Sequence, residues 1–113
     1  MRALSLRLVA ALALTLVIGC SSNSRPTGRV RNDRATKVNV QFKDAVANTT
    51  NINDVLGGST SAYVDLEPGP YTVTAVIQNE SVSPTITFTA QTNRTYTLVV
   101  VAGATPTLRV DTP

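Results

Sequence analysis

The segment that decides the fold reads Glu67-Pro68-Gly69-Pro70-Tyr71-Thr72-Val73-Thr74-Ala75-Val76-Ile77. From Tyr71 to Ile77 an apolar side chain occupies every second position, with Thr72 and Thr74 in between. A period of two places alternate side chains on opposite faces of a β-strand. Pro68 and Gly69 are the residues that a type II turn favours at its two central positions. The segment therefore predicts a tight turn followed by a strand with one buried face.

Similar alternation recurs on both sides of this strand, between turns rich in Gly, Pro, Asn and Ser. The runs with one apolar face are residues 38–42, 62–66, 86–90, 96–102 and 108–110. In the fourth run Val99 and Val101 are apolar as well, so we expect that strand to be central and covered on both faces for part of its length. No stretch has a helical period. About seven short strands at this spacing predict an all-β fold, a small antiparallel β-sandwich over residues 29–113.

The composition limits the chemistry that the chain can perform. It has 113 residues, no His and a single Cys, Cys20, which leaves room for one domain. Without His, neither a Ser-His-Asp triad nor a Cys-His pair can form. The usual ligand sets for zinc, copper and iron–sulfur centres cannot be assembled within one such chain. We therefore expect no enzyme, no metal site and no cofactor.

Residues 1–19 have the features of a lipoprotein signal peptide. Arg2 and Arg7 precede the uncharged run 8–18, which as a helix spans about 16 Å against a bilayer core of about 30 Å. The run ends in Val17-Ile18-Gly19-Cys20, which resembles a bacterial lipobox. That resemblance implies cleavage between Gly19 and Cys20 and acylation of Cys20, a use for the odd Cys. The alternatives are an ordinary secretory signal with a chance Cys, or a buried apolar segment.

Residues 20–28 are expected to form the lipidated Cys and a flexible tether, since they are Ser, Asn, Arg, Pro, Thr and Gly after Cys20. Two or three acyl chains suffice for stable membrane anchoring. Ser21 follows the Cys, where bacteria with two membranes commonly use Asp to retain a lipoprotein in the inner membrane. We therefore expect an exported protein, anchored by lipid in the cell envelope at the outer membrane.

The charges of the chain are divided unevenly. Residues 25–43 carry six cations and one anion, a net charge of +5, and residues 44–113 carry two cations and six anions, a net charge of −4. Anionic head groups or a phosphorylated envelope glycan are the expected counter-charges of the basic part. Nucleic acid is not an expected partner, because no aromatic residue precedes Phe42 in the basic part and the chain is exported.

Two acidic patterns are candidate chemical sites. Asp65 and Glu67 share one strand face at about 6.5–7 Å, a spacing in the range that inverting glycosidases use. Two solvent-facing carboxylates at a strand end are the preferred interpretation. Residues 51–54, Asn-Ile-Asn-Asp, suggest a calcium loop, but Leu56 and Ala62 stand where an EF-hand needs Gly and Glu. A polar turn is preferred there.

Tyr63 and Tyr71 flank the Pro68-Gly69 turn and form the candidate ligand platform. Exposed tyrosine rings offer an apolar face with a polar tip, which suits stacking on carbohydrate. The alternative is that these rings fill the core, because the chain has only five aromatic residues.

Three segments resemble the bacterial domain of unknown function 4397. They are the strand–turn–strand of residues 58–74, the early strand 38–44 and the later strand 93–101. The resemblance covers about residues 28–112 and implies a β-sandwich of the cell envelope or a secreted one, with no catalytic residues to carry over. The family's usual His is missing, and Asn39 stands where an acid is common. The Pro-Gly-X-Tyr-Thr pattern also resembles transthyretin-like and carboxypeptidase-regulatory-like modules.

These observations predict a lipid-anchored envelope β-sandwich that acts as a non-catalytic binding or accessory module. Its expected partners are the membrane, through acyl chains on Cys20, and an envelope polysaccharide or protein. The alternatives are a purely structural envelope lipoprotein and a glycan-modifying enzyme that uses carboxylates.

Overall fold

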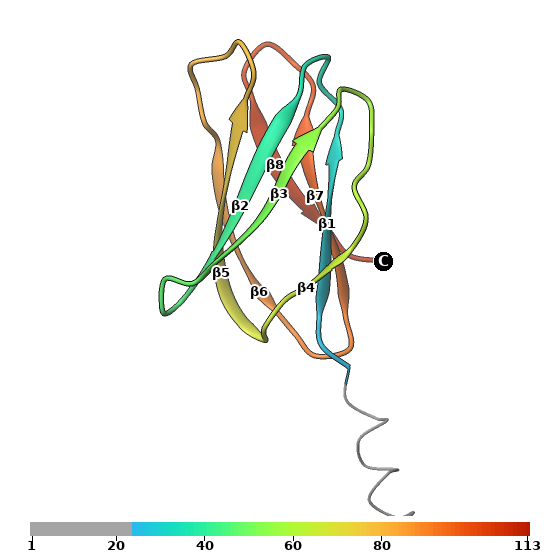
Figure 1. The fold of residues 1–113 in the computed structure, drawn as a ribbon, viewed down its shortest axis with the longest axis vertical. Helices are drawn as coiled ribbons and strands as arrows, with labels where there is room; N and C mark the ends of the chain where they lie inside the picture. Colours follow the sequence, from blue (N-terminus) through green and yellow to red (C-terminus); the bar gives the residue numbers. More distant parts are fainter. Residues whose placement is uncertain (1–23) are drawn as a thin grey trace, which may run out of the picture.

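The computed structural model describes residues 24–113, which fold into eight strands and no helix (Figure 1). The strands are β1 (Thr27–Asn32), β2 (Val38–Asp44), β3 (Thr49–Val55), β4 (Val64–Asp65), β5 (Gly69–Ile77), β6 (Thr85–Ala90), β7 (Thr95–Val101) and β8 (Thr107–Asp111). The expected signal peptide, residues 1–19, and Cys20 lie outside the described residues. Within residues 24–113 there is no helix of the length and apolarity that crossing a membrane requires.

The strands form two four-stranded sheets, in the orders β4-β1-β7-β8 and β3-β2-β5-β6. Figure 1 shows the two sheets face to face, so the predicted all-β sandwich is confirmed. It is not wholly antiparallel, because β1 pairs with β7 in parallel, from Thr27 opposite Thr95 to Asn32 opposite Val100. Parallel neighbours need a long crossover rather than a hairpin, and here the chain visits the other sheet between the two strands.

Strands β1 and β3 are absent from the runs that the sequence patterns predict. The preferred interpretation of residues 51–54 as a polar turn is wrong, since they lie within β3. Strand β2 pairs with β3 through Val38 opposite Val55 and Val40 opposite Ile52. The register of the two strands shifts by one residue between these pairs, which indicates a β-bulge. At the bulge Asp54 has a φ of 59°, and its amide donates to Asn39 Oδ1 at 2.7 Å. Because the bulge interrupts the alternation and only Ile52 and Val55 are buried, no period of two was visible.

The ends of two predicted segments also differ from the structure. Strand β1 begins at Thr27, inside the range 20–28 expected as a tether. The predicted run 62–66 pairs with β1 only through Val64 and Asp65. Leu66 is nevertheless buried, and a Cβ added to Gly28 would lie 3.0 Å from its Cδ1 atom. Gly28 therefore leaves space for the Leu66 side chain over β1.

The core lies between the two sheets and follows the predicted alternation. Its fully or nearly buried side chains include Val30, Val38, Val40, Phe42, Tyr71, Val73, Ala75, Ile77, Tyr96, Leu98 and Val100. Four aromatic rings form a cluster within it: the rings of Tyr71 and Phe88 are stacked at 5.8 Å, and those of Phe88 and Tyr96 lie 5.0 Å apart. Each buried tyrosine hydroxyl accepts a backbone hydrogen bond, Tyr71 from Glu67 and Tyr96 from Gln91, both at 2.8 Å. Each of these hydroxyl oxygens therefore has a hydrogen-bond partner inside the fold.

Asn32 is the one buried polar side chain of residues 24–113 and lies at the end of β1. Its Nδ2 donates to the carbonyls of Thr36 at 2.7 Å and Val55 at 3.0 Å, and its Oδ1 accepts from the amide of Arg34 at 2.9 Å. The side chain therefore joins the β1–β2 crossover to the end of β3. Gly57 packs beside the same crossover, where a Cβ would lie 2.3 Å from the Ala35 carbonyl oxygen.

The face assignment of β5 can be tested with a matched pair of substitutions. Val73 is fully buried and Thr74 is half-buried on the opposite face. Val73→Asp is expected to place an unpaired charge in the core and cost several kcal/mol of a stability of about 5–15 kcal/mol. Thr74→Asp is expected to change the stability by about 0.5 kcal/mol. Urea unfolding followed by circular dichroism measures both, and a larger loss from Thr74→Asp would contradict the assignment.

Candidate functional site

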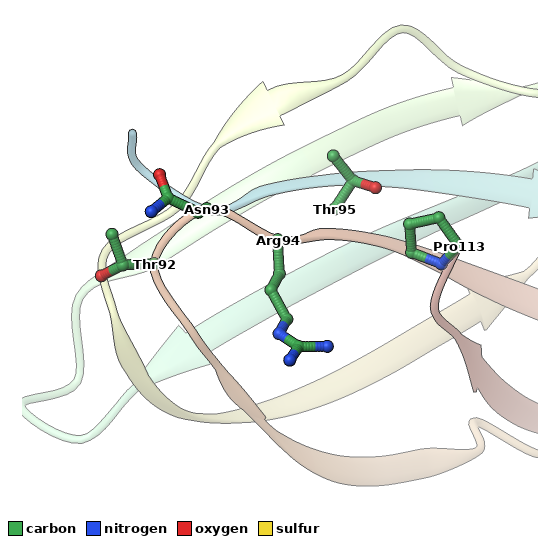
Figure 2. A pocket seen from close by; sticks show the side chains of 5 residues that line it. All are labelled: Thr92, Asn93, Arg94, Thr95 and Pro113. Atoms are coloured by element: carbon green, nitrogen blue, oxygen red, sulfur yellow. The ribbon is translucent and has the colours of Figure 1, made fainter. Parts of the chain in front are cut away.

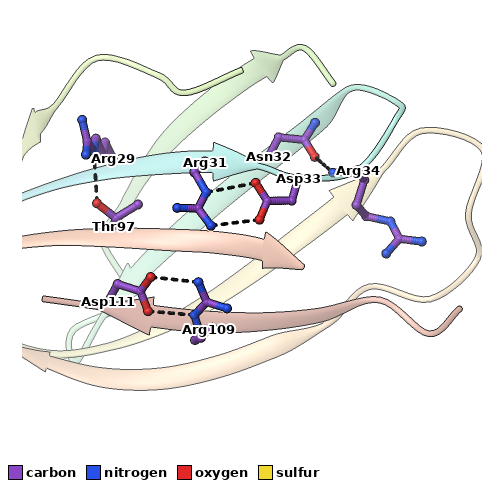
Figure 3. A network of polar contacts seen from close by, with 8 residues as sticks. All are labelled: Arg29, Arg31, Asn32, Asp33, Arg34, Thr97, Arg109 and Asp111. Atoms are coloured by element: carbon purple, nitrogen blue, oxygen red, sulfur yellow. Dashed lines mark hydrogen bonds and ion pairs between the residues drawn. The ribbon is translucent and has the colours of Figure 1, made fainter. Parts of the chain in front are cut away.

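The outer surface of sheet β4-β1-β7-β8 carries arginines in ordered rows, shown in Figure 3. Strand pairing places Arg29, Thr97 and Asp111 in one row and Arg31, Val99 and Arg109 in the next. The surface formed by these six residues and Tyr63 is named the arginine face here. It follows from alternation, because Val30 and Asn32 point inward and leave the intervening arginines outside.

Two bidentate ion pairs organise one half of the arginine face. Arg31 donates to Asp33 at 2.9 and 3.0 Å, and Arg109 donates to Asp111 at 2.8 and 2.9 Å. The hydrogen bond from Arg31 holds the pKa of Asp33 below its ordinary value, and that from Arg109 does the same for the pKa of Asp111. All four groups therefore stay charged across the neutral range.

Val99 lies between Arg31 and Arg109 on this outer face and is nevertheless fully buried. The aliphatic stems of long cationic side chains can cover apolar surface while their charged ends stay in water. This arrangement explains the extra apolar residue of the sequence, and it confirms that β7 is central and covered on both faces there.

Arg29 and Tyr63 form the other half of the arginine face. The guanidinium carbon of Arg29 lies 4.7 Å from the centroid of the Tyr63 ring, a cation–π contact. Arg29 Nε also donates to Thr97 Oγ1 at 3.1 Å, and Arg29 makes no ion pair within residues 24–113. The Tyr63 side chain is 45% exposed, so the tyrosine and the unneutralised cation together remain available to a ligand.

A shallow groove of about 230 Å³ runs along this part of the surface. It is lined by Arg29, Arg31, Tyr63, Thr95, Thr97, Asp111, Thr112 and Pro113. A second open hollow, of about 390 Å³, adjoins it through Thr95 and Pro113 and contains Arg94 (Figure 2). Arg94 likewise makes no ion pair among the residues that the structure describes.

The predicted platform of two tyrosines is not formed. Tyr71 is 4% exposed and belongs to the core, where its hydroxyl accepts from the Glu67 amide. The strand alternation of residues 71–77 already placed it on the buried face. Tyr63 remains on the surface, and its neighbour is Arg29, a residue that sequence reasoning did not single out. Arg29 and Tyr63 are 34 positions apart, and only the pairing of β1 with β4 brings them together.

The two carboxylates weighed as a catalytic pair are both exposed. Asp65 lies on β4. Glu67 forms an ion pair with Arg25 at 2.8 Å, and the side chains of Glu67 and Arg25 are each 59% exposed. The segment considered for calcium is a strand, and residues 24–113 contain no group of three or more acidic or Cys side chains that could hold a metal ion.

The uneven charge of the sequence is largely cancelled in the fold. Acidic residues from the second part of the chain pair with the basic part: Glu67 with Arg25, Glu80 with Arg34 at 2.6 Å, and Asp54 with Lys37 at 3.3 Å. The basic stretch is therefore not an uncompensated surface. The cations left without a carboxylate partner in residues 24–113 are Arg29, Lys43 and Arg94.

Comparison with known proteins identifies a similar fold but no family. No protein-family model and no curated sequence matches the chain. A solved structure, the N-terminal domain of AlgF from P. aeruginosa, aligns with a TM-score of 0.52 and 23% sequence identity. The alignment covers 79% of this chain and 95% of that domain. The similarity supports the β-sandwich fold.

Asp33 and Asp111, the ion-pair partners of Arg31 and Arg109, are expected to contribute to acid sensitivity. Because their folded pKa values are lowered, their stabilising effect is complete above the unfolded value of about 3.9 and is lost as the pH falls through the folded values. Asp33→Asn with Asp111→Asn is therefore expected to lower the urea midpoint slightly at pH 7 and to flatten its decline below about pH 4. Asp65→Asn, an exposed residue without an ion pair in the described part, is the control. An unchanged decline in the double variant would contradict the proposed linkage.

Proposed function

We propose that this protein is a non-catalytic binding module of the bacterial cell envelope, anchored by acyl chains on Cys20 after removal of residues 1–19. The lipobox-like sequence Val17-Ile18-Gly19-Cys20 supports the anchor. Ser21 after the Cys supports delivery to the outer membrane. The folded domain then presents the arginine face to an envelope polysaccharide.

The contact between Arg29 and Tyr63 is the observation that carries this proposal. A sugar ring can stack on the face of Tyr63 that is turned away from Arg29. The guanidinium over the other face offers several hydrogen-bond donors with a fixed geometry at the edge of the ring. The hydrogen bond to Thr97 and the cation–π contact hold the Arg29 side chain in place. A binding group that is already ordered loses less conformational entropy when it binds a ligand.

The shape of the groove favours a polymer over a small molecule. Pockets for small ligands usually enclose about 300–1,000 Å³ and bury most of the ligand, whereas this groove is open and holds about 230 Å³. An open groove along a sheet can contact successive units of an extended chain. A protein partner is the alternative ligand of the same surface.

A binding role also agrees with the placement of the acidic residues. A general acid needs a carboxyl with a raised pKa in a partly enclosed site. Glu67 is exposed and paired with Arg25, so it does not lie in an enclosed site.

A purely structural lipoprotein is the second candidate, and the opposite surface favours it. The outer face of sheet β3-β2-β5-β6 carries uncharged polar residues around a small hollow, Asn39, Gln41, Asn51, Asn53 and Thr74, with Val76 beside them. The hollow itself offers neither a charged nor an aromatic anchor, and Lys43 lies outside it, farther along β2 on the same face. An uncharged polar surface of this kind is what a component without a ligand would present.

Retention on immobilised envelope polysaccharide tests the binding role. Tyr63→Ala and Arg29→Gln are each expected to weaken retention about tenfold, which corresponds to about 1.4 kcal/mol. Val76→Ala, at a residue exposed on the other sheet, and Arg25→Gln are the matched controls and are expected to bind as the wild type does. Equal retention of Tyr63→Ala and wild type would reject the arginine face. Release of new reducing ends by the wild type, lost in Glu67→Gln, would reject the non-catalytic role.

A further inference from the structure

We propose that one end of the sandwich rests on the membrane and inserts an apolar hairpin tip between the lipid head groups. This end consists of Ser24, the loop of residues 91–94 and the hairpin tip of residues 45–47, and is named the proximal end here. The inference rests on the proposed lipid anchor at Cys20, and it adds the orientation of the domain and a second membrane contact.

The proposed anchor and the fold are separated by a short stretch of chain. The Ser24 amide donates to Asn93 Oδ1 at 2.6 Å, and the Asn93 amide donates to the Ser24 carbonyl at 2.8 Å. Only Ser21, Ser22 and Asn23 separate Ser24 from Cys20. Four residue steps reach at most about 14 Å, whereas the nine residues of β5 span about 30 Å. A lipidated Cys20 therefore holds the proximal end close to the head groups and leaves the opposite end farther away.

The hairpin that joins β2 to β3 has an unusually apolar tip. Its tip is Ala45-Val46-Ala47, where hairpin turns commonly carry Asn, Asp or Gly. Val46 is 74% exposed, and Ala47 adopts a left-handed φ of 68°, a conformation that favours glycine. Asp44 Oδ1 accepts from the amides of Val46 and Asn48, at 3.0 and 2.9 Å. The tip is thus a structured turn that exposes apolar side chains to solvent.

The hairpin tip lies on the same end as the entry of the chain. Residues 44–46 and 67–70 line one small hollow, and Glu67 is joined to Arg25 by the ion pair of 2.8 Å. Figure 1 shows the start of β1, the β4–β5 turn and the β6–β7 turn gathered at this end, with the hairpin beside them.

The charges of this end allow contact with lipid head groups. Arg25 and Glu67 pair with each other, while Lys43, Arg94, Asp44 and Asp65 make no ion pair within residues 24–113. Three cations and three carboxylates leave this end without net charge, so it is not repelled by an anionic surface. Lys43 and Arg94 can each pair locally with a head-group phosphate. At the opposite end, Arg34 is bound to Glu80 and to the carbonyls of Val101 and Gly103.

Depth-dependent fluorescence quenching tests this orientation in the full-length lipidated protein. Val46→Cys and Val82→Cys are matched variants, because Val82 is a 48% exposed valine in the β5–β6 loop at the opposite end. Acylated Cys20 leaves only the new thiol free for an environment-sensitive fluorophore. The labelled protein is reconstituted in vesicles of phosphatidylglycerol and phosphatidylcholine, with and without brominated acyl chains. Quenching by bromine is expected to be at least threefold stronger at position 46 than at position 82.

The outcomes separate the orientation from the anchor. Mass spectrometry of the same sample reports the acyl chains, and Cys20→Ala in cells fed a labelled fatty acid is expected to carry no label. If the protein is acylated but quenching is equal at the two positions, or stronger at position 82, the proposed membrane contact of the proximal end is rejected and the lipid anchor stands. Protein without acyl chains overturns both. If the label at position 46 is protected from a water-soluble quencher but not reached by bromine, it is covered by a second copy of this chain, the only other protein in the vesicles. That result also overturns the membrane contact.

Discussion

Strand β1 pairs in parallel with β7 over six residue pairs, and both the fold and the candidate site depend on this pairing. It places Gly28, Val30 and Asn32 in the core and Arg29 and Arg31 outside. The buried Asn32 amide then joins the end of β1 to the crossover and to β3. These hydrogen bonds specify one arrangement of the chain around Asn32. If the crossover or β3 moved relative to β1, the carbonyls of Thr36 and Val55 would lose their partner.

The fold also determines which charges remain available. In sequence the chain is strongly dipolar, but folding brings Glu67, Glu80 and Asp54 to cations of the basic part. Exposed pairs of this kind contribute little to stability, so their main consequence is for recognition. Among residues 24–113, Arg29 has no carboxylate partner and lies next to Tyr63 on the sheet surface, and Lys43 and Arg94 have none near the point where the chain enters the fold. The proposed polymer contact and the proposed membrane contact therefore use different cations.

The alternation of apolar residues was sufficient to predict the all-β class, the buried faces of β2, β5 and β7 and the burial of Val73. It could not predict β3, because a bulge at Asp54 breaks the period of two, nor the parallel partner of β1, because pairing between distant strands leaves no local pattern. Of the candidate site, only the exposed Tyr63 was predicted. Tyr71 lies in the core, as the alternation that identified β5 already indicated. Arg29 was not predicted, because its contact with Tyr63 depends on strand pairing between residues 34 positions apart. The resemblance to the domain of unknown function 4397 stays an expectation, as does the lipobox, whose residues lie outside the described part of the chain.

The central claim is that the arginine face, and not the outer face of the other sheet, binds an envelope polysaccharide. Nuclear magnetic resonance tests it most directly, by titrating isotope-labelled protein beginning at Ser21 with soluble fragments of that polysaccharide and following every backbone amide. The account predicts that the resonances of Arg29, Tyr63 and Thr97 shift in a saturable manner while those of Gln41 and Thr74 stay in place. Saturable shifts confined to β2, β3 and β5, or no saturable shift at any amide, would contradict it.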